Sequence, residues 1–588
     1  MKTAKKVFVS FLALTLMLGC LSIAAVADEA VVGSGTAQGR NGPVTVEVTF
    51  DGDVITAVTI VESSESVGVS DAAQEIIPAQ MVEYQTTAVD AVGGATLTSA
   101  ALRLAAQAAI QSAGKDPKNY SERVPAHEAV DLEDMNCDIV VVGGGIAGLM
   151  SALTAKAEGA ENVILIEKHA QVGGSAALSS AFMVTAEYDK FEEAFPDYDD
   201  SLEKVLDGLR ITAESGDPKY EVNWDYLEFI ERAMPETLDF LFDLGLTAQF
   251  RTLSTAVTAW DGQGRGLLKS LGELAEKQGI TVLVNTTGTE LLIDENGAVC
   301  GVKAVSNGDN LNIYANAVIL TTGGSSFASG AEFDNKPAES RAIFFQGAST
   351  GDTGDGQVMA AAVGAEIVGN LRLKQAGIEY NQTLRSSLAK KPSTDNSMIV
   401  NAEGLRFASE KQASSQVLTD ILLAEGSPKY FVIIDTADEE LAAALKDAYE
   451  NKLAIYYGET IADLAAAIGV DAENLQASYD RYQNFCESGM DEDFGKPEAN
   501  LIAYTGAQGY YAINIYAAGW GTMGGGIKTD DVGHVLDTNG NIIANLYAAG
   551  EVSDHDIFGQ YYVGGMSMST FAAGGHITGR TAVQELAG

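Results

Sequence analysis

Two runs near the start of the chain alternate between hydrophobic and polar positions. Residues 44–50 are VTVEVTF and residues 54–61 are VITAVTIV, with DGD between them. Alternation with a period of two is typical of strands that bury one face, and the short polar connection favours a β-hairpin. A helix-like run follows near residues 71–84, and an Ala-rich run, RLAAQAAIQSAG, ends at residue 114. These patterns predict a small α+β domain over residues 30–114.

A different pattern begins at residue 137, where continuous apolar runs replace the alternation. Residues 137–168, CDIVVVGGGIAGLMSALTAKAEGAENVILIEK, hold an apolar strand, a glycine-rich turn, a helix and a second strand. Gly143, Gly145 and Gly148 have the GxGxxG spacing, and Glu167 follows about 20 residues later. This context predicts a Rossmann-like turn, in which the first glycine turns the chain, the second admits a pyrophosphate and the third packs helix on strand. Glu167 would accept hydrogen bonds from an adenosine ribose.

Between these two regions, residues 115–136 are polar and contain two prolines. They lack helical or strand periodicity, so they predict a linker.

Composition narrows the class of protein. The formal net charge is -45 at pH 7, which opposes binding to nucleic acid or to an anionic membrane surface. Acidity of this degree is also typical of exported proteins that must stay soluble.

The first residues have the pattern of a secretory signal. Lysines precede an apolar run, and the small-x-small sequence AVA follows at residues 25–27. We therefore expect a signal peptide over residues 1–27 and a secreted or cell-surface protein. Two alternatives are an uncleaved anchor and a lipid anchor at Cys20, which ends the imperfect lipobox MLGC. No second stretch is long and apolar enough to span a bilayer.

The remaining cysteines, Cys137, Cys300 and Cys486, are far apart in the sequence. Their spacing predicts buried single thiols. No CxxCH haem motif and no cysteine cluster for an iron–sulfur centre occurs, so electrons would enter through another cofactor.

The segment before the Ala-rich helix carries candidate chemistry. Residues 90–98, DAVGGATLT, resemble the Asp-x-x-Ser/Thr-Gly-Ala-Thr-x-Thr/Ser motif of the FMN-binding domain of sodium-pumping quinone reductase subunits and many bacterial flavoproteins. The resemblance implies that a flavin transferase joins FMN covalently, through its phosphate, to Thr98, with Gly94 and Thr96 in the same loop. Glycines and a helix N-terminus also suit a phosphate. Gly93 departs from the motif, and the alternative role of Thr98 is a simple helix cap.

Four glycine-rich segments follow the Rossmann-like turn: VGGSAALSS (172–180), TTGGSS (321–326), TGDGQVMAA (353–361) and LYAAGEV (546–552). Together with that turn they resemble the flavoprotein family of fumarate reductase and succinate dehydrogenase, particularly its soluble single-chain members. The resemblance implies an α/β fold in which a Rossmann-like FAD-binding domain (137–377 and 509–588) is interrupted by a capping domain (378–508).

Non-covalent FAD is the cofactor that this family implies. The candidate FAD-binding residues are Gly143, Gly145, Ala147, Gly148, Glu167, Lys168, Gly173, Gly174, Ser175, Gly323, Gly324, Asp355, Gly550, Glu551, Gly565 and Ser567.

The family's cationic substrate residues are replaced at the matching positions. Ser414 stands at the position of the proton-donating arginine, Tyr562 at that of a second arginine and Trp520 at that of a histidine. With Tyr561 they predict an aromatic, neutral pocket for a neutral or bulky substrate, in which a tyrosine polarises a carbonyl or delivers a proton. The alternative for the two tyrosines is packing beside the flavin.

An acidic substrate stays open at this point. Arg372, Arg385 or His555 would then form a different carboxylate clamp, although solvated surface is the simpler interpretation of each.

The predicted activity is reduction of a carbon–carbon double bond conjugated to a carbonyl of a small molecule. Electrons would pass from a membrane donor, a quinol or NADH dehydrogenase system, to FMN and then to FAD. The alternatives are a desaturase like the ketosteroid dehydrogenases, an enoate reductase with a non-standard clamp, and a flavin electron shuttle without catalysis.

Overall fold

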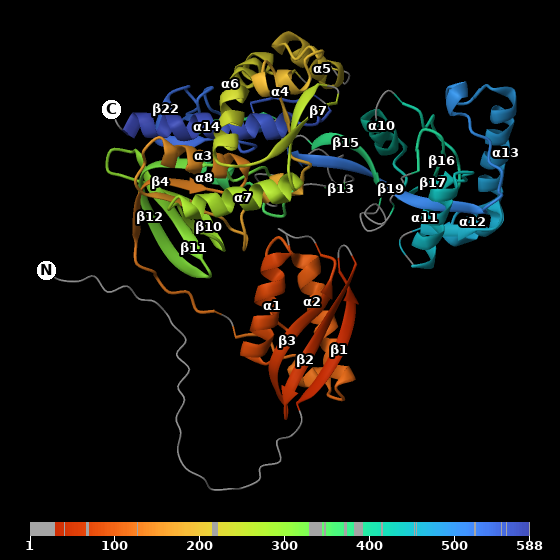
Figure 1. Cartoon of the computed structure of the whole chain (residues 1–588), viewed down its shortest axis with the longest axis horizontal. Helices are drawn as coiled ribbons and strands as arrows, with labels where there is room; N and C mark the ends of the chain where they lie inside the picture. The colour runs from red at the N-terminus through yellow and green to blue at the C-terminus, as the bar shows by residue number, and fades with distance from the viewer. Residues whose placement is uncertain are drawn as a thin grey trace, which may run out of the picture.

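Three bodies are visible in the computed structural model of the chain (Figure 1). They are an N-terminal domain in red, a large central domain and a lobe of teal and blue elements beside it. The described residues are 30–39, 42–65, 70–125, 127–214, 221–253, 255–327, 344–345, 348–369, 373–380, 388, 392–412, 415–451, 453, 455–522, 525–553, 555–559 and 561–586. The predicted signal segment, including Cys20, lies outside these ranges.

The N-terminal domain is an antiparallel sheet packed against two helices. Its strands are β1 (Val31–Gln38), β2 (Pro43–Asp51) and β3 (Val54–Ser63), and its helices are α1 (Asp71–Tyr84) and α2 (Thr96–Ser112). Every second residue of β2, from Val44 to Phe50, is fully buried, because alternate side chains of a strand point to the same face. The predicted hairpin and the helix near residues 71–84 are confirmed, whereas β1 had no prediction.

The predicted linker is attached to both domains that it joins. Its first part forms the 3-10 helix η1 (Pro117–Tyr120), and the Tyr120 ring packs 5.6 Å from the Phe50 ring of the N-terminal core. Farther along, Val130 N donates to Asp309 Oδ1 of the central domain at 2.9 Å. The segment is therefore more ordered than its sequence predicts.

The central domain is built on an eight-stranded mixed sheet. Its main path is β10-β11-β12-β4-β5-β9, with β22 beside β12 and β21 beside β22. The strands are β4 (Met135–Val142), β5 (Val163–Ile166), β9 (Thr281–Leu283), β10 (Thr286–Ile293), β11 (Val299–Ser306), β12 (Asp309–Leu320), β21 (His534–Leu536) and β22 (Ile542–Ala548). All four residues of β5 are buried, as expected for a parallel strand with both faces covered.

Two helices cross closely on one side of this sheet. α3 (Ile146–Ala157) follows the glycine turn, and α14 (Met566–Leu586) comes from the end of the chain. A Cβ on Gly575 of α14 would lie 2.3 Å from the Ala147 carbonyl oxygen, so only glycine permits this approach. The crossing brings the C-terminal segment to the start of α3.

The remaining elements of the central domain pack around this sheet and the two crossing helices. They are η2 (Gly174–Leu178), β6 (Phe182–Val184), α4 (Asp189–Ala194), α5 (Leu202–Ala213), α6 (Trp224–Asp243), β7 (Ala248–Thr252), β8 (Ala256–Trp260), α7 (Gln263–Lys277), α8 (Asp355–Ala362), β14 (Ile367–Gly369) and β20 (Gly525–Ile527). In the part of the chain that the structure describes, no helix has the length and apolarity needed to cross a membrane.

The lobe contains a second sheet with its own helices. The order β13-β19-β17-β16 is extended by β15 and β18, both beside β19. Its elements are β13 (Phe344–Phe345), β15 (Leu373–Tyr380), β16 (Met398–Asn401), α10 (Ser415–Glu425), β17 (Tyr430–Ile434), α11 (Glu439–Glu450), β18 (Ile455–Gly458), α12 (Ile461–Ile468), α13 (Ala472–Ser488), η5 (Glu498–Asn500) and β19 (Tyr510–Thr522). The predicted boundary at 377/378 falls inside β15, which pairs with β19, so these strands connect lobe and central domain.

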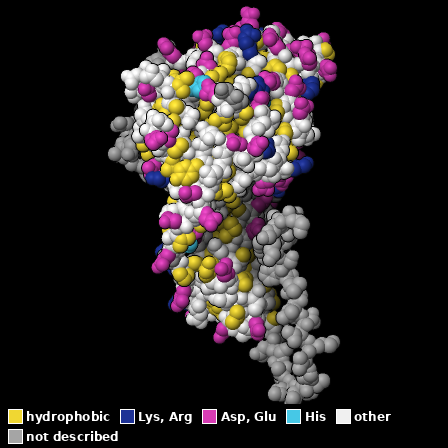
Figure 2. Space-filling view, turned by 90° about the vertical axis from the view of Figure 1, so that its left-hand side faces the viewer, with side chains coloured by type: hydrophobic (Ala, Val, Ile, Leu, Met, Phe, Trp, Pro, Cys, Tyr) yellow, Lys and Arg dark blue, Asp and Glu magenta, His cyan; other side chains and the backbone are white. Residues whose placement is uncertain are grey.

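The acidic side chains are spread over the surface (Figure 2), and the three described cysteines are unpaired. Figure 2 shows Asp and Glu side chains spread over both the large body and the N-terminal domain rather than gathered in one patch. Cys137, Cys300 and Cys486 are free thiols, as expected, but each is half-buried rather than buried.

Candidate functional site

A cavity lies at the carboxyl ends of β4, β5 and β12 in the central domain. Segments far apart in the sequence line it: 142–147, 166–168, 174–176, 179–182, 286–288, 321–323, 348–349, 351–352, 355, 550–551, 562, 564–565, 567–568 and 571. The carboxyl edge of a parallel sheet is where α/β folds bind their ligands.

The glycine turn after β4 forms one wall of the cavity. Gly143 has a φ of +114°, which L side chains rarely adopt. Gly148 is packed tightly, since a Cβ there would lie 1.9 Å from the Gly143 carbonyl oxygen. Gly145, in contrast, has no heavy atom within 4 Å of the position of a Cβ. The turn therefore offers open space at its middle glycine, beside the N-terminus of α3, where a phosphate is favoured.

Glu167 stands at the end of β5, next to this turn. Gly144 N donates to its Oε2 and His169 N donates to its Oε1, each at 2.8 Å. The carboxylate is thereby fixed at the cavity wall, although only 7% of the residue is exposed.

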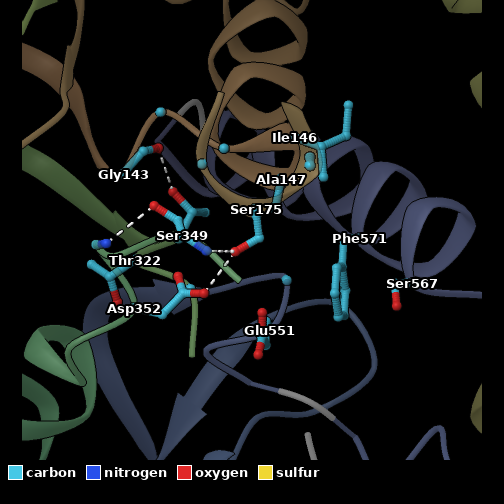
Figure 3. A pocket seen from close by; sticks show the side chains of 18 of the residues that line it. Gly143, Ile146, Ala147, Ser175, Thr322, Ser349, Asp352, Glu551, Ser567 and Phe571 are labelled. Carbon is cyan, nitrogen blue, oxygen red and sulfur yellow. Dashed lines mark hydrogen bonds between the residues drawn. The ribbon is translucent and has the colours of Figure 1, made fainter. Parts of the chain in front are cut away.

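Asp352, which the sequence interpretation missed, lines the cavity and belongs to a buried network. Ser175 Oγ donates to Asp352 Oδ2 at 2.6 Å, and Ser349 N donates to Ser175 Oγ at 2.8 Å (Figure 3). Burial raises the pKa of Asp352 to about 6, while the Ser175 hydrogen bond opposes that rise. The carboxyl can thus accept or donate a hydrogen bond near neutral pH.

Lys168, the neighbour of Glu167, is tied to the start of α8 and the loop before it. Its Nζ donates to Asp355 Oδ2 at 2.6 Å and also to the Thr353 hydroxyl. Among the described residues that line the cavity, it is the only lysine or arginine.

The residues present fit FAD. Thr322 Oγ1 is buried at the cavity wall and has no hydrogen-bond partner among the described residues. A buried hydroxyl without a partner costs free energy, and a polar ligand would relieve that cost. With the open space at Gly145 and the fixed carboxylate of Glu167, the cavity offers phosphate, ribose and polar contacts in one place.

The structure brings most of the predicted FAD residues together. Those that line the cavity are Gly143, Gly145, Ala147, Glu167, Lys168, Gly174, Ser175, Gly323, Asp355, Gly550, Glu551, Gly565 and Ser567. Gly148, Gly173 and Gly324 do not line it but belong to the same turns.

Tyr562 lies on the cavity wall, as do Ser567 and Phe571 of α14. Its ring stacks on Phe558 at 5.2 Å, and Ser567 Oγ donates to its hydroxyl oxygen at 3.4 Å. Burial raises the pKa of Tyr562, so its hydroxyl keeps its proton at neutral pH. Ser567 and Phe571 approach from α14 on this side (Figure 3). The sequence placed Tyr562 in the substrate pocket, and the structure puts it on the cavity wall.

Tyr561 has a different position from the one the sequence suggested. Its hydroxyl donates to Asp420 Oδ2 on α10 at 2.6 Å, and it does not line the cavity. Nearby, Gln416 Nε2 of α10 donates to the Tyr562 carbonyl oxygen at 3.2 Å. Tyr561 therefore joins the lobe to the central domain instead of facing the ligand.

The other candidate substrate residues contribute no described side chain to the cavity. Ser414, Arg372 and Arg385 lie outside the described residues, as does the side chain of Trp520 in β19. His555 stacks on Tyr226 at 3.7 Å, and burial lowers its pKa to about 4, so it is neutral at pH 7. A clamp for a carboxylate through His555 is therefore unfavourable.

Arg406 belongs to the core of the lobe. Its guanidinium pairs with Glu410 at 2.9 Å and with Asp491 at 2.7 Å, and all three side chains are almost fully buried. The positive charge of Arg406 is therefore paired within the lobe, and Arg406 does not line the cavity.

The loop at residues 90–95 of the N-terminal domain leads into the first turn of α2, which contains Thr98. Gly94 has a φ of +82°, and Thr98 is the third residue of α2. The Thr98 hydroxyl donates to a carboxylate oxygen of Glu65, at the end of β3, and only 4% of Thr98 is exposed. Thr96 lies on the exposed side of the same turn.

His169 of the central domain explains the departure at Gly93. A Cβ on Gly93 would lie 3.2 Å from His169 Cδ2, closer than an ordinary contact. The motif's serine or threonine would press on this ring, so glycine at 93 accommodates the neighbouring domain.

Two residues, Asp352 and Glu65, were not predicted from the sequence, and only Asp352 lies beside a segment that the sequence pattern singled out. Asp352 stands in the glycine-rich run STGDTGDG, of which only Asp355 was singled out. Glu65 precedes α1 in a polar stretch and has no local feature that points to Thr98.

Comparisons with known proteins match both halves of the chain. The model of the FAD binding domain matches residues 138–568, and that of the FMN-binding domain matches residues 39–111. Urocanate reductase of Eggerthella lenta is 30% identical over 571 residues, which cover 93% of this chain and 91% of that protein. A cytochrome fumarate reductase of Shewanella frigidimarina is 29% identical over 79% of this chain and 80% of its own length.

A solved structure agrees at the level of fold. The open conformation of a flavocytochrome c3 fumarate reductase superposes with a TM-score of 0.64 at 22% identity, over 79% of this chain and 83% of that one. The predicted α/β fold class and the small N-terminal domain are confirmed.

Proposed function

This chain belongs to the family of flavoproteins with an FAD binding domain and an N-terminal FMN-binding domain, related to urocanate and fumarate reductases, and we propose that it reduces a double bond conjugated to a carbonyl. As a member it is a flavin oxidoreductase acting on CH–CH bonds. The proposed substrate is a neutral or bulky enone.

The observation that carries this substrate class is the composition of the cavity end at Tyr562. Tyr562, Met568 and Phe571 supply apolar and aromatic surface there. The only described lysine or arginine on the wall, Lys168, pairs with Asp355 near the ribose side. Such a wall favours a planar apolar molecule over a dicarboxylate, because a carboxylate buried without a cation is costly.

The proposed mechanism assigns the proton to Tyr562. FAD, when bound, supplies the hydride for the β-carbon. Tyr562 holds a proton at its hydroxyl at neutral pH and would donate it toward the carbonyl or the α-carbon. Ser567 donates to the same oxygen and would stabilise the negative charge left after proton transfer.

Electron supply is the second part of the proposal. FMN joined to Thr98 by a flavin transferase would receive electrons from a membrane donor, a quinol or NADH dehydrogenase system, and pass them to FAD. The expected signal peptide supports export to the cell surface, where such a donor would be reached.

An anaerobic screen tests this function. The protein is purified after co-expression with a flavin transferase, reduced chemically and mixed with enones, enoates and saturated ketones, and flavin reoxidation is followed by absorbance. We expect reoxidation by enones. A response only to enoates would favour an enoate reductase, oxidised protein acting on saturated ketones would favour a desaturase, and no response to any compound would favour an electron shuttle.

Replacement of Tyr562 tests the proton donor. Tyr562→Phe should lower kcat roughly 10²-fold, as expected for loss of a general acid, while FAD stays bound. Tyr547→Phe is the matched control, since its hydroxyl donates to Glu585 at 2.5 Å, away from the cavity. Full turnover by Tyr562→Phe would remove the proposed donor but not the enzyme class.

A further inference from the structure

The hydroxyl proposed to receive FMN already has a base beside it. Thr98 Oγ1 donates its proton to a carboxylate oxygen of Glu65, and the two residues are 4% and 8% exposed. Two further contacts surround Glu65: its backbone N–H donates to Ser63 Oγ at 3.3 Å, and its other carboxylate oxygen lies close to Gly39, 2.6 Å from the position that a Cβ would take there. The carboxylate therefore has a defined position against the acceptor oxygen.

We propose that Glu65 is the catalytic base of this chain's own modification, taking the proton of Thr98 as FMN is attached. The proposal rests on the proposed covalent FMN at Thr98. It means that the acceptor domain contributes a reacting group to the step and is more than a passive substrate of the transferase.

The chemistry requires such a group. An alcohol is a weak nucleophile until its proton is removed, and in phosphoryl transfer a carboxylate that accepts the hydroxyl proton is a recurring solution. FMN alone has no leaving group, so the co-reactant is a flavin dinucleotide, FAD, bound by the transferase. Thr98 Oγ1 forms a bond to the phosphorus of the FMN half, the pyrophosphate bond breaks and AMP leaves. The proton goes to Glu65, and no electron changes hands.

Electrostatics favours the same assignment. The phosphodiester brings a negative charge to a buried position beside the Glu65 carboxylate, and two adjacent anions repel each other strongly at low dielectric. If Glu65 receives the proton, its own charge disappears as the phosphate charge arrives. The first turn of α2, which contains Thr98, then faces a single anion, which a helix N-terminus stabilises.

Two substitutions separate a base from a structural support. Glu65→Gln keeps the size of the side chain and an oxygen that can accept the Thr98 hydrogen bond, but it cannot take the proton. Glu65→Asp keeps a carboxylate that can take the proton, but the shorter side chain places it farther from the Thr98 hydroxyl. Glu62→Gln is the matched control, because Glu62 is exposed on β3, three residues before Glu65.

The experiment follows the adduct and not the turnover of the enzyme. Full-length protein made without transferase is incubated with purified transferase, FAD and Mg²⁺, and the mass of the peptide containing Thr98 is measured over time at several protein concentrations. We expect Glu65→Gln to lower kcat of modification roughly 10²-fold or more with little change in KM, Glu65→Asp to recover part of the rate, and Glu62→Gln to match the wild type. Thermal unfolding of each variant checks that the domain is folded.

The outcomes distinguish the proposed role of Glu65 from the proposed attachment of FMN to Thr98, on which it rests. Modification of Glu65→Gln at the wild-type rate would overturn the role of Glu65 and leave covalent FMN intact. A rise in KM alone would also overturn it, because it would assign Glu65 to docking. Wild-type protein that gains no flavin mass at Thr98 would overturn both.

Discussion

The two flavin sites of this chain are built in opposite ways. The FAD cavity gathers its wall from segments between residues 142 and 571, including the glycine turn, the Asp352 loop and α14. The FMN site is proposed at one buried hydroxyl, that of Thr98 in the first turn of α2, with one carboxylate, that of Glu65, beside it. A ligand held without a bond needs many converging contacts to offset its lost freedom, whereas a covalent bond needs only a reactive atom in the right place.

The largest effect is expected from removing the proposed acceptor oxygen, the hydroxyl oxygen of Thr98. Thr98→Ala should abolish the covalent flavin completely, because nothing else in the loop replaces the acceptor oxygen, while FAD remains bound. Mass spectrometry and fluorescence of denatured protein check this result. Thr59→Ala is the control, since Thr59 is exposed on β3 and lies outside the motif. An adduct that persists in Thr98→Ala would move the FMN site elsewhere.

A substitution at the FAD turn should cause a large but partial loss. Gly145→Val places a side chain in the open space of the cavity, so FAD should bind about 10²-fold more weakly in a protein that still folds. Titration of FAD-free protein with FAD measures the effect.

Gly148→Val is the contrasting variant for that experiment. Its Cβ would overlap the Gly143 carbonyl oxygen, so this change should impair folding itself. Equal FAD affinity in Gly145→Val and wild type would show that the FAD phosphates do not lie beside this glycine.

The smallest effect concerns the pH dependence of the FAD cavity. Because burial raises the pKa of Asp352 to about 6 from 3.8, its neutral form favours the folded state. Its contribution to the free energy of unfolding is complete below about pH 4 and is lost as the pH rises through 6.

Asp352→Asn tests that contribution. Between about pH 5 and about pH 7, the free energy of unfolding should fall by about 1.4 kcal/mol more in the wild type than in the variant. Denaturant unfolding of FAD-free protein at the two pH values provides the measurement, and parallel pH profiles of the two proteins would contradict the raised pKa.

Several elements were determined by the sequence itself. The alternation over residues 44–61 forms the β2–β3 hairpin, and the GxGxxG spacing after an apolar strand forms the turn between β4 and α3. Such elements depend on neighbours a few residues away, so a short pattern contains nearly all the information. The motif around Thr98 is equally local.

Only the tertiary structure decided which side chains share a site. Ser175 meets Asp352 across 177 positions and Tyr561 meets Asp420 across 141, and neither pair has a sequence signal. Tyr561 and Tyr562 are adjacent in the chain, yet one joins the lobe and the other faces the cavity. The physical reason is that a partner across the fold is selected by how whole sheets and helices pack, and no spacing along the chain records that packing.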